Sequence, residues 1–441
     1  LRLIASDVSD AEFSFPSGSA PAMSVQFVGG RGALFWLAFK TGFLTIMTLG
    51  FYRFWMKTRL RRWYWSAIRP CGHPMEYVGD PIEKLLGFFI AVVILTFYIG
   101  IIHLILMFVS FSVFSSATLG YFAAGFGVVP LWFYARYRAR RYVLGRTRWR
   151  GVRFGLDKGA WGYVWRAMLH WLVTIFSLGL LWPRMTFYLE KYTTDRTFFG
   201  SAQLHQGGRW GMLYRAAIPF ALFTLLLLGS VAHAYISAAS QTFDTSGFAS
   251  KMLETLADGQ GAPFSMQGAW WLLLFPVSLL GMVYGAVHYR FVSKRLMANH
   301  KSTNGIAITS RLSAPRIAFI YVFGSFIAYS VHVLGVILLV LGAFVVIGPS
   351  AFMGFDLGID IETLPIPRAL AIVVLAGFYL SVFLMWNVCY NTFVTFPLMR
   401  HMAITCALPR YDGLQSISQS GRDDFAEAEG FAEALDLGAA I

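Results

Sequence analysis

The sequence predicts an all-α, polytopic membrane protein, and two properties of its composition support this class. The chain has 441 residues, of which 57% are hydrophobic and only 13% are charged. A soluble domain normally carries about 25% charged residues, so this chain lacks the polar surface of a globular fold. Its apolar residues are also concentrated in runs longer than about 18 residues, the length that a transmembrane helix requires.

Six apolar segments are long enough to cross a bilayer at a rise of about 1.5 Å per residue. They cover approximately residues 84–114, 118–144, 213–238, 268–298, 315–346 and 367–399. Two further apolar segments, 32–50 and 162–182, are each followed by an aromatic stretch with basic or polar residues. The sequence therefore predicts about six full transmembrane helices and two additional helical hairpins.

Short segments of alternating apolar and polar residues recur beside glycines and predict β-strands. They lie at approximately residues 25–29, 74–79, 152–156, 201–206 and 306–310. Strand backbone cannot face lipid with its hydrogen bonds unpaired. We therefore expect these short strands on one side of the membrane, paired in a small sheet.

An internal repeat with an offset of about 128 residues connects these elements. SVQFVGGRGALF at 24–35 corresponds to RGVRFGLDKGAW at 150–161, and TLG at 48–50 corresponds to SLG at 177–179. The repeat divides the chain into a flexible leader, membrane repeats 1 and 2, a partial membrane repeat 3 and an acidic cytoplasmic tail. These parts cover residues 1–23, 24–150, 151–303, 304–408 and 409–441.

The distribution of charge assigns the strands and both termini to the cytoplasm. The net charge is +14, and basic residues cluster where apolar segments lead into strands, as in RYRARRYVLGRTRWRG at 136–151. The opposite loops, 239–267 and 347–366, carry six acidic residues against one lysine. The positive-inside rule places the basic segments in the cytoplasm. A membrane surface then explains the positive charge, and no nucleic-acid partner is expected.

The stretch FYRFWMKTRLRRWYW at 51–65 combines five cations with seven aromatic residues. It lies between two cytoplasmic strands, so a full crossing would take Arg53 and Lys57 back through the bilayer at roughly 2.5–3.5 kcal/mol each. We therefore predict a re-entrant or interfacial hairpin that turns near Thr48-Leu49-Gly50, with a second one at 162–198. The alternative is an ordinary two-span hairpin whose cations face the protein interior.

The recurring pattern resembles the YjgN family of bacterial inner-membrane proteins, which contain a domain of unknown function. The resemblance covers most of residues 24–400, although Glu190-Lys191 replaces a basic doublet in the second copy. It implies a multi-pass protein of the bacterial inner membrane without implying an activity. It also implies partnership with a membrane-linked zinc metallopeptidase, because such proteins are often encoded nearby. The motifs are QFVGG at 26–30, TLGFYRFW at 48–55, RLRRWYW at 59–65, GHPMEYVGD at 72–80, RYRARRYVLGRTRWRGVRFGL at 136–156 and SLGLLWPRMTFYLEKY at 177–192.

Motifs typical of enzymes are missing from the sequence, which has no P-loop, G-x-S-x-G, H-E-x-x-H or dinucleotide fingerprint. The spacing of cysteine and histidine does not suit zinc. Cys71, Cys389 and Cys406 are expected to stay free of disulfides. We therefore expect no enzymatic activity, no metal site and no cofactor.

The cationic cytoplasmic face is the strongest functional signal, because basic residues near anionic headgroups contribute about 1 kcal/mol each. The alternative is that these charges serve only topology and anchoring. The residues expected to bind a lipid headgroup or another anionic ligand are Lys57, Arg59, Arg61, Arg62, Arg138, Arg140 and Arg141.

Polar residues inside the predicted spans form a second candidate set. These residues are His103, His233, His332, Asn387 and Asn391. The three histidines lie at comparable depth and could hold a proton, a metal or haem, or bond to a neighbouring helix. The two asparagines share a helical face at i, i+4 spacing and could line a polar path or join helices.

Two functions fit these observations. A transporter, channel or lipid-handling protein for a small or anionic ligand would explain re-entrant segments, which are typical of permeation paths. A non-catalytic accessory or scaffold subunit would explain the lack of catalytic motifs, the 41 phenylalanines and the acidic tail. The six predicted spans have no acidic residue in their interiors, which argues against a proton-coupled transporter.

Overall fold

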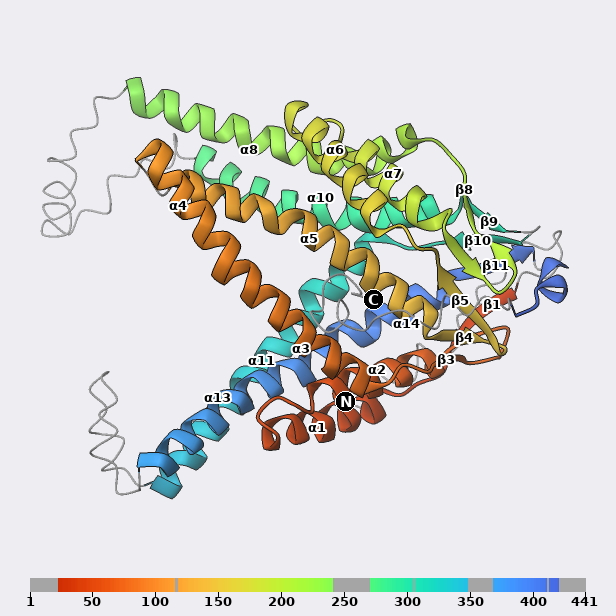
Figure 1. Cartoon of the computed structure of the whole chain (residues 1–441), viewed down its shortest axis with the longest axis horizontal. Helices are drawn as coiled ribbons and strands as arrows, with labels where there is room; N and C mark the ends of the chain where they lie inside the picture. Colours follow the sequence, from red (N-terminus) through yellow and green to blue (C-terminus); the bar gives the residue numbers. More distant parts are fainter. Residues whose placement is uncertain are drawn as a thin grey trace, which may run out of the picture.

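The computed structural model describes residues 23–115, 118–240, 270–303, 306–347, 368–410 and 412–419. Its long helices extend from one end of the molecule, where the strands are gathered (Figure 1). The predicted leader lies almost entirely outside the described residues, as do the acidic segment 421–438 and most of both acidic loops.

Short β-strands alternate with helical segments along the described chain. They form two antiparallel sheets, with strand orders β2-β1-β11-β10-β9-β8 and β3-β4-β5-β6-β7. The strands are β1 Met23–Phe27, β2 Ile68–Pro70, β3 Met75–Tyr77, β4 Thr147–Trp149, β5 Val152–Leu156, β6 Thr197–Phe199, β7 Ala202–Gln203, β8 His205–Gln206, β9 Lys301–Thr303, β10 Ile306–Ser310 and β11 Cys406–Arg410.

The predicted predominance of helix is confirmed, but the strands form two sheets instead of one small sheet, so the fold is not all-α. The predicted strands 152–156 and 306–310 coincide with β5 and β10, whereas β2, β4, β6, β9 and β11 were not predicted. Most of these strands have only three residues, too few to show a period of two. Pro409 also makes β11 look unsuited to a sheet. Pairing with neighbours, rather than local pattern, makes these segments strands.

Each long helical segment connects two strands that pair antiparallel, so it leaves the sheets and returns to them at neighbouring positions. Strands that are consecutive in the chain pair antiparallel, except at β2–β3 and β7–β8, where the chain passes from one sheet to the other. Five of the connections between strands contain helical segments. At each of these five, a backbone hydrogen bond joins the chain where it leaves the sheets to the chain where it returns. These bonds join Val28 N to Ala67 O, Val78 N to Arg146 O, Asp157 N to Arg196 O, Gly207 N to His300 O, and Arg311 N to Thr405 O.

The two sheets share one hydrophobic core. Trp149 of β4, Phe199 of β6 and Ile306 of β10 are buried in it. Ile417, which follows β11, packs into the same cluster. Because these residues come from both sheets, the strands form a single structural unit that anchors the helices.

Helices cover the described residues of all six predicted spans. Among the residues that the structure describes, four stretches are long and apolar enough to cross a membrane, namely Pro81–Val113, Trp210–His233, Ala314–Gly342 and Ala376–Ile404. The predicted spans at α5 and α10 are helical but are not among these four. The helices are α3 Pro81–Phe97, a π-helical turn Tyr98–Ile102, α4 His103–Phe114, α5 Thr118–Gly145, α8 Tyr214–Ser240, α10 Trp270–Ala298, α11 Ala314–Ile347, α13 Arg368–Tyr390, a π-helical turn Asn391–Thr395 and α14 Phe396–Ile404.

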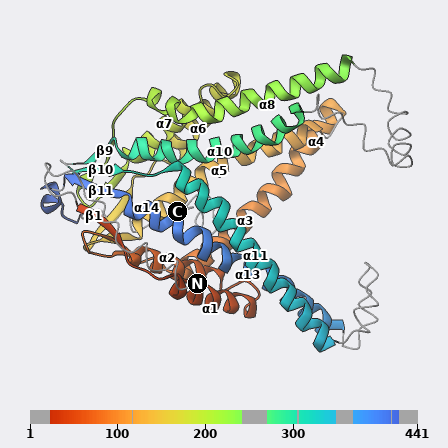
Figure 2. The same cartoon turned by 180° about the vertical axis from the view of Figure 1, so that it is seen from behind.

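Away from the sheets, the long helices diverge into two groups (Figures 1 and 2), with α11 and α13 in one group and α4, α5, α8 and α10 in the other. Within the second group, α8 and α10 approach closely at two glycines in a G-x-x-x-G pattern. A Cβ added at Gly285 would lie 2.6 Å from the Cα of Phe220, and one at Gly281 would meet the Phe223 ring. Small residues at such spacing let membrane helices pack backbone to backbone.

The two predicted hairpins are helical. The first consists of α1 Arg31–Met47 and α2 Arg53–Ala67, and the second of α6 Ala160–Phe176 and α7 Trp182–Thr194. The first turns at Thr48-Leu49-Gly50, as predicted, and Pro183 lies in the first turn of α7, where its fixed φ suits a helix start. Both hairpins lie beside the long helices near the sheets (Figures 1 and 2).

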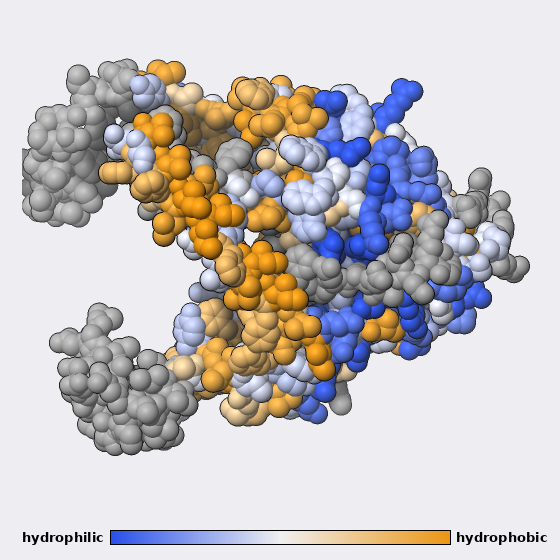
Figure 3. Space-filling view, in the orientation of Figure 1, coloured by the Kyte–Doolittle hydropathy of each residue, from blue (hydrophilic) through white to orange (hydrophobic). Residues whose placement is uncertain are grey.

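The molecular surface is divided along its length. Hydrophobic residues cover the helical part in the view of Figure 3, and hydrophilic residues gather around the strand end. This division fits a protein whose helices lie in a bilayer while its sheets lie at or beyond the surface.

Candidate anion-binding site

A cavity of about 300 Å³ lies where α5 meets the loop between β5 and α6. On α5, four lining residues follow i, i+3, i+4, i+7 spacing and so occupy one helical face. All three charged side chains in the lining are cationic, and they are accompanied by three aromatic rings. The lining residues are Tyr134, Tyr137, Arg138, Arg141, Lys158, Gly159, Ala160 and Trp161.

Two tyrosines hold the β5–α6 loop, with Tyr137 tying it to α5 and Tyr192 tying it to α7. The Tyr137 hydroxyl donates to the Asp157 carbonyl at 2.8 Å, and the Tyr192 hydroxyl donates to the Gly159 carbonyl at 2.9 Å. A Cβ at Gly159 would lie 2.9 Å from the Tyr192 oxygen, so a larger residue would push this loop away. The loop therefore depends on glycine to keep the start of α6 at the cavity.

The start of α6 adds to the positive potential of the cavity. No side chain caps this helix, so the N–H groups of its first turn are available to an acceptor. The N-terminus of a helix also carries a partial positive charge that favours anions. Together with Arg138, Arg141 and Lys158, it makes a site suited to a phosphate, sulfate or carboxylate group.

The aromatic rings provide an apolar wall beside these charges. Tyr134 and Trp161 pack with ring centroids 5.1 Å apart, and the Arg138 guanidinium lies 5.8 Å from the Tyr134 centroid. Arg196 lies 3.8 Å from the centroid of Tyr192. Most of the exposed cavity lining is polar, so the cavity suits a charged group better than an apolar ligand.

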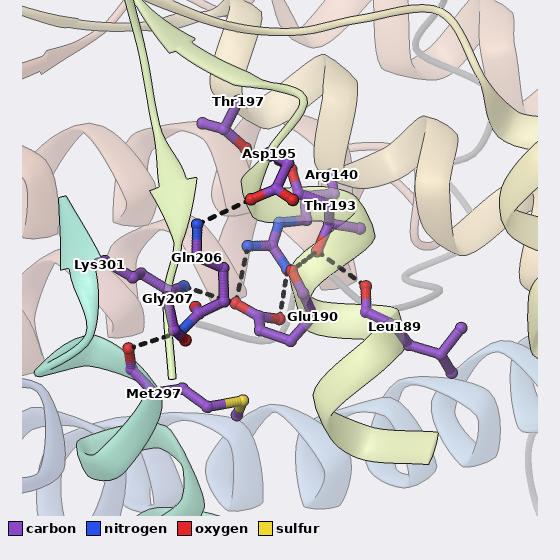
Figure 4. Close-up of polar contacts among 10 residues, drawn as sticks. All are labelled: Arg140, Leu189, Glu190, Thr193, Asp195, Thr197, Gln206, Gly207, Met297 and Lys301. Carbon is purple, nitrogen blue, oxygen red and sulfur yellow. Dashed lines mark hydrogen bonds and ion pairs between the residues drawn. The ribbon is translucent and has the colours of Figure 1, made fainter. Parts of the chain in front are cut away.

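Arg140 belongs to a separate ion network on the neighbouring part of α5. Its guanidinium contacts Glu190 of α7 at 3.1 and 3.3 Å, and Lys301 of β9 contacts the same carboxylate at 2.7 Å. Figure 4 shows Glu190 between the two cations. Burial raises the pKa of Glu190, but Arg140 and Lys301 outweigh this effect and hold it well below its usual range. Arg140 therefore takes part in the contacts that join α5, α7 and β9.

The predicted cations of the first hairpin do not converge on one cavity. Arg61 is buried and lies 5.3 Å from the Tyr77 ring centroid of β3. Arg62 donates to the Gly79 carbonyl at 2.9 Å, and Arg59 is exposed. Lys57 is half-buried. Arg61 and Arg62 therefore tie α2 to β3 and to the residues just after that strand.

The predicted intramembrane histidines lie on three different helices. His103 begins α4, His233 is on α8, and His332 on α11 packs its ring 5.6 Å from that of Trp386. In the described part of the chain, no group of three His, Cys, Asp or Glu residues could hold a metal ion.

The two asparagines do lie together. The side-chain amide of Asn391 donates to the backbone and side-chain oxygens of Asn387, both at 2.9 Å. Asn391 opens a π-helical turn, and its carbonyl accepts from Tyr64 of α2 at 3.4 Å. The pair therefore helps to join α13 to the first hairpin.

The comparisons with known proteins identify a family. A family model described as a bacterial protein of unknown function, DUF898, matches residues 22–348. The chain belongs to this family. YjgN proteins are members of DUF898, so the predicted resemblance is confirmed. The DUF898 match includes both hairpins and the cavity. No curated protein and no solved structure matches the chain.

Six residues of the cavity lining were not predicted from the sequence, namely Tyr134, Tyr137, Lys158, Gly159, Ala160 and Trp161. Tyr134 and Tyr137 could have been found from their helical spacing to Arg138 and Arg141. Lys158 and Trp161 flank a glycine between a predicted strand and a predicted helix, which is a common arrangement for anion sites. Gly159 is the glycine of this strand–glycine–helix arrangement, but only the folded structure shows that it lies beside α5.

Proposed function

We propose that this protein is a multi-pass protein of the bacterial inner membrane that binds the headgroup of an anionic phospholipid. The observation that carries the proposal is the cavity of about 300 Å³ with three cationic and three aromatic side chains. The phosphate would bind Arg138, Arg141 and Lys158 together with the first N–H groups of α6. The aromatic wall at Tyr134 and Trp161 would contact the glycerol and the start of the acyl chains.

The proposed orientation places the sheets, the cavity and both termini in the cytoplasm. The support is the basic character of the strand end, which the positive-inside rule assigns to that side, and the separation of polar and apolar surface (Figure 3). In this topology α5 and α10 cross the membrane together with the four apolar stretches, giving six spans. The inner leaflet is also the leaflet in which anionic headgroups attract basic segments.

Lipid handling explains the cavity better than transport of a small solute. The cationic end of α5 would lie at headgroup depth, and a lipid could enter from the side between helices. The protein would act by binding rather than by catalysis. The second candidate is an accessory subunit for another membrane protein, such as a metallopeptidase, and the large apolar surface of α3, α4, α11 and α13 favours it.

Native mass spectrometry of the protein extracted gently from its membrane tests both candidates. We expect retained phosphatidylglycerol or cardiolipin in the wild type and at least a tenfold loss of it in Arg138→Gln/Lys158→Gln. Arg209→Gln is the control, because Arg209 is an exposed cation outside the cavity and outside the predicted headgroup set. Retention of inorganic phosphate without lipid would indicate a soluble anion as ligand. Unchanged lipid in the double variant, or a stoichiometric second polypeptide, would contradict the proposal.

A further inference from the structure

The tips of the two hairpins expose large apolar side chains at the turn itself. Leu49 is 75% exposed and Leu178 is 94% exposed. Exposed flanking residues are also apolar, namely Met47, Phe51, Phe176 and Leu180. An apolar patch of this kind marks a contact with a partner or a membrane.

The backbone N–H groups of the first tip find their acceptors within the tip. The N–H of Leu49 donates to Ile46 O at 2.9 Å and that of Gly50 to Thr45 O at 2.7 Å, which is the Schellman arrangement. The N–H of Tyr52 donates to the Thr48 hydroxyl at 2.9 Å. That hydroxyl donates in turn to Leu44 O at 2.8 Å. Phe51 and Arg53 donate to carbonyls within the same turn.

The second tip repeats this arrangement residue by residue. Leu178 N donates to Ile175 O at 2.9 Å, and Gly179 N to Thr174 O at 2.8 Å. Leu181 N donates to the Ser177 hydroxyl at 3.1 Å, as Tyr52 does to Thr48. Hydrocarbon tolerates backbone only when its polar groups are satisfied internally. Both tips meet this requirement for their N–H groups.

A leucine at either of these turns would be unfavourable if the turn were exposed to water. Leu49 and Leu178 have φ of 49° and 50°, a region where non-glycine residues are uncommon and where helix ends normally place glycine or asparagine. Each hairpin instead places a strained leucine at its most exposed point. An exposed apolar side chain at this position is favourable only if its surroundings are apolar.

The depth of the hairpins is limited. Both first arms, α1 and α6, have 17 residues, about 25 Å of helix, and neither is among the four stretches able to span a membrane. The two hairpins point the same way as the long helices and end well short of them (Figures 1 and 2). Arg53 and Arg184 follow closely after the turns, and cations near a tip keep it within reach of headgroups.

We propose that the two hairpin tips are wedges in one leaflet of the bilayer, with Leu49 and Leu178 among the acyl chains. The wedges enter from the side of the sheets, flank the long helices and do not reach the opposite face. This inference does not depend on the anion-binding cavity.

Spin labels in proteoliposomes test the insertion. Leu49→Cys and Leu178→Cys are labelled with a nitroxide in a variant whose three free cysteines are replaced by serine. Collision with oxygen, which concentrates in lipid, is compared with collision with a water-soluble nickel chelate. Leu338→Cys on α11 gives the lipid reference, and Ser302→Cys on β9 gives the water reference. We expect both tips to match the lipid reference, and agreement with the water reference would overturn the proposal.

A membrane-impermeant maleimide gives a second measurement that retains the native cysteines. Labelling of vesicles of each orientation is read peptide by peptide with mass spectrometry. We expect both tip cysteines to be protected at least tenfold from either face, relative to Ser302→Cys. Labelling from the sheet side would show that the tips lie in water. Labelling from the opposite face alone would show a full crossing, and either result would refute a wedge in one leaflet.

Discussion

Replacing Glu190 with glutamine removes the one acidic side chain that holds Arg140 and Lys301 together. The neutral amide keeps the size and some hydrogen bonding of the carboxylate. The two cations, which each contact the carboxylate within 3.3 Å, would then repel each other without compensation. The variant therefore tests whether charge, rather than packing, joins α5, α7 and β9.

The expected cost follows from the exposure of the three side chains. An exposed ion pair contributes at most about 1 kcal/mol, whereas removing one partner of a fully buried pair costs about 3–5 kcal/mol. Glu190 is 25% exposed and Lys301 is 17% exposed, but Arg140 is 38% exposed. Because solvent screens Arg140, we expect Glu190→Gln to lower the free energy of unfolding by about 2 kcal/mol.

Reversible unfolding in mixed micelles, followed by the fluorescence of the 14 tryptophans, measures this cost. Lys301→Met supplies the second half of a double-mutant cycle. It should destabilise the wild type but have little effect, or a stabilising one, in Glu190→Gln, where it relieves repulsion from Arg140. An equal effect of Lys301→Met in both backgrounds would show that the three charges are not coupled, and the argument would fail.

Three further predictions concern the same network, a hairpin tip and a helix contact. Because the pKa of Glu190 is lowered in the folded protein, its carboxylate stabilises the fold fully at any pH above its unfolded pKa of about 4.3. The difference in unfolding free energy between wild type and Glu190→Gln should therefore stay constant from pH 5 to 8 and shrink below about pH 4, which a pH titration of stability would measure. Thr48→Val, which keeps the shape but removes the acceptor for Tyr52 N–H, should cost about 1–2 kcal/mol in bilayer-like micelles, and an unchanged unfolding curve would contradict the hydroxyl's role. Gly285→Leu should separate α8 from α10 at Phe220 and lower stability by about 1–3 kcal/mol, whereas Gly229→Leu, at an open site on α8, should have a much smaller effect.

Local signals in the sequence were sufficient for some elements of the fold. The turn at Thr48-Leu49-Gly50 was predicted because a glycine follows a complete apolar helix, and the backbone there closes through bonds within six residues. β5 and β10 were predicted because five residues show alternation. β4 and β6 have three residues each, and only their pairing with neighbours defines them.

The candidate site shows a similar division. The sequence marked Arg138, Arg140 and Arg141 as one cluster, because composition does not distinguish adjacent residues on a helix. Successive side chains on a helix point about 100° apart, so the fold directs Arg140 to Glu190 and the other two to the cavity. The partners Glu190 and Lys158 come from other segments, and no local pattern specifies which cation each one meets.

The pairing of β1 with β11 has a consequence for how the protein is made. Met23 pairs with Leu408 and Ser24 with Ala407, so β1 can pair with β11 only after all the helices and strands between them have left the ribosome. At synthesis rates of 5–20 residues per second, β1 waits roughly 20–80 s for this partner. Until then one edge of β1 is open to pairing with other chains. Closure by β11 would therefore come late in the assembly of this sheet, and a chain that stops before β11 would keep one edge of β1 open.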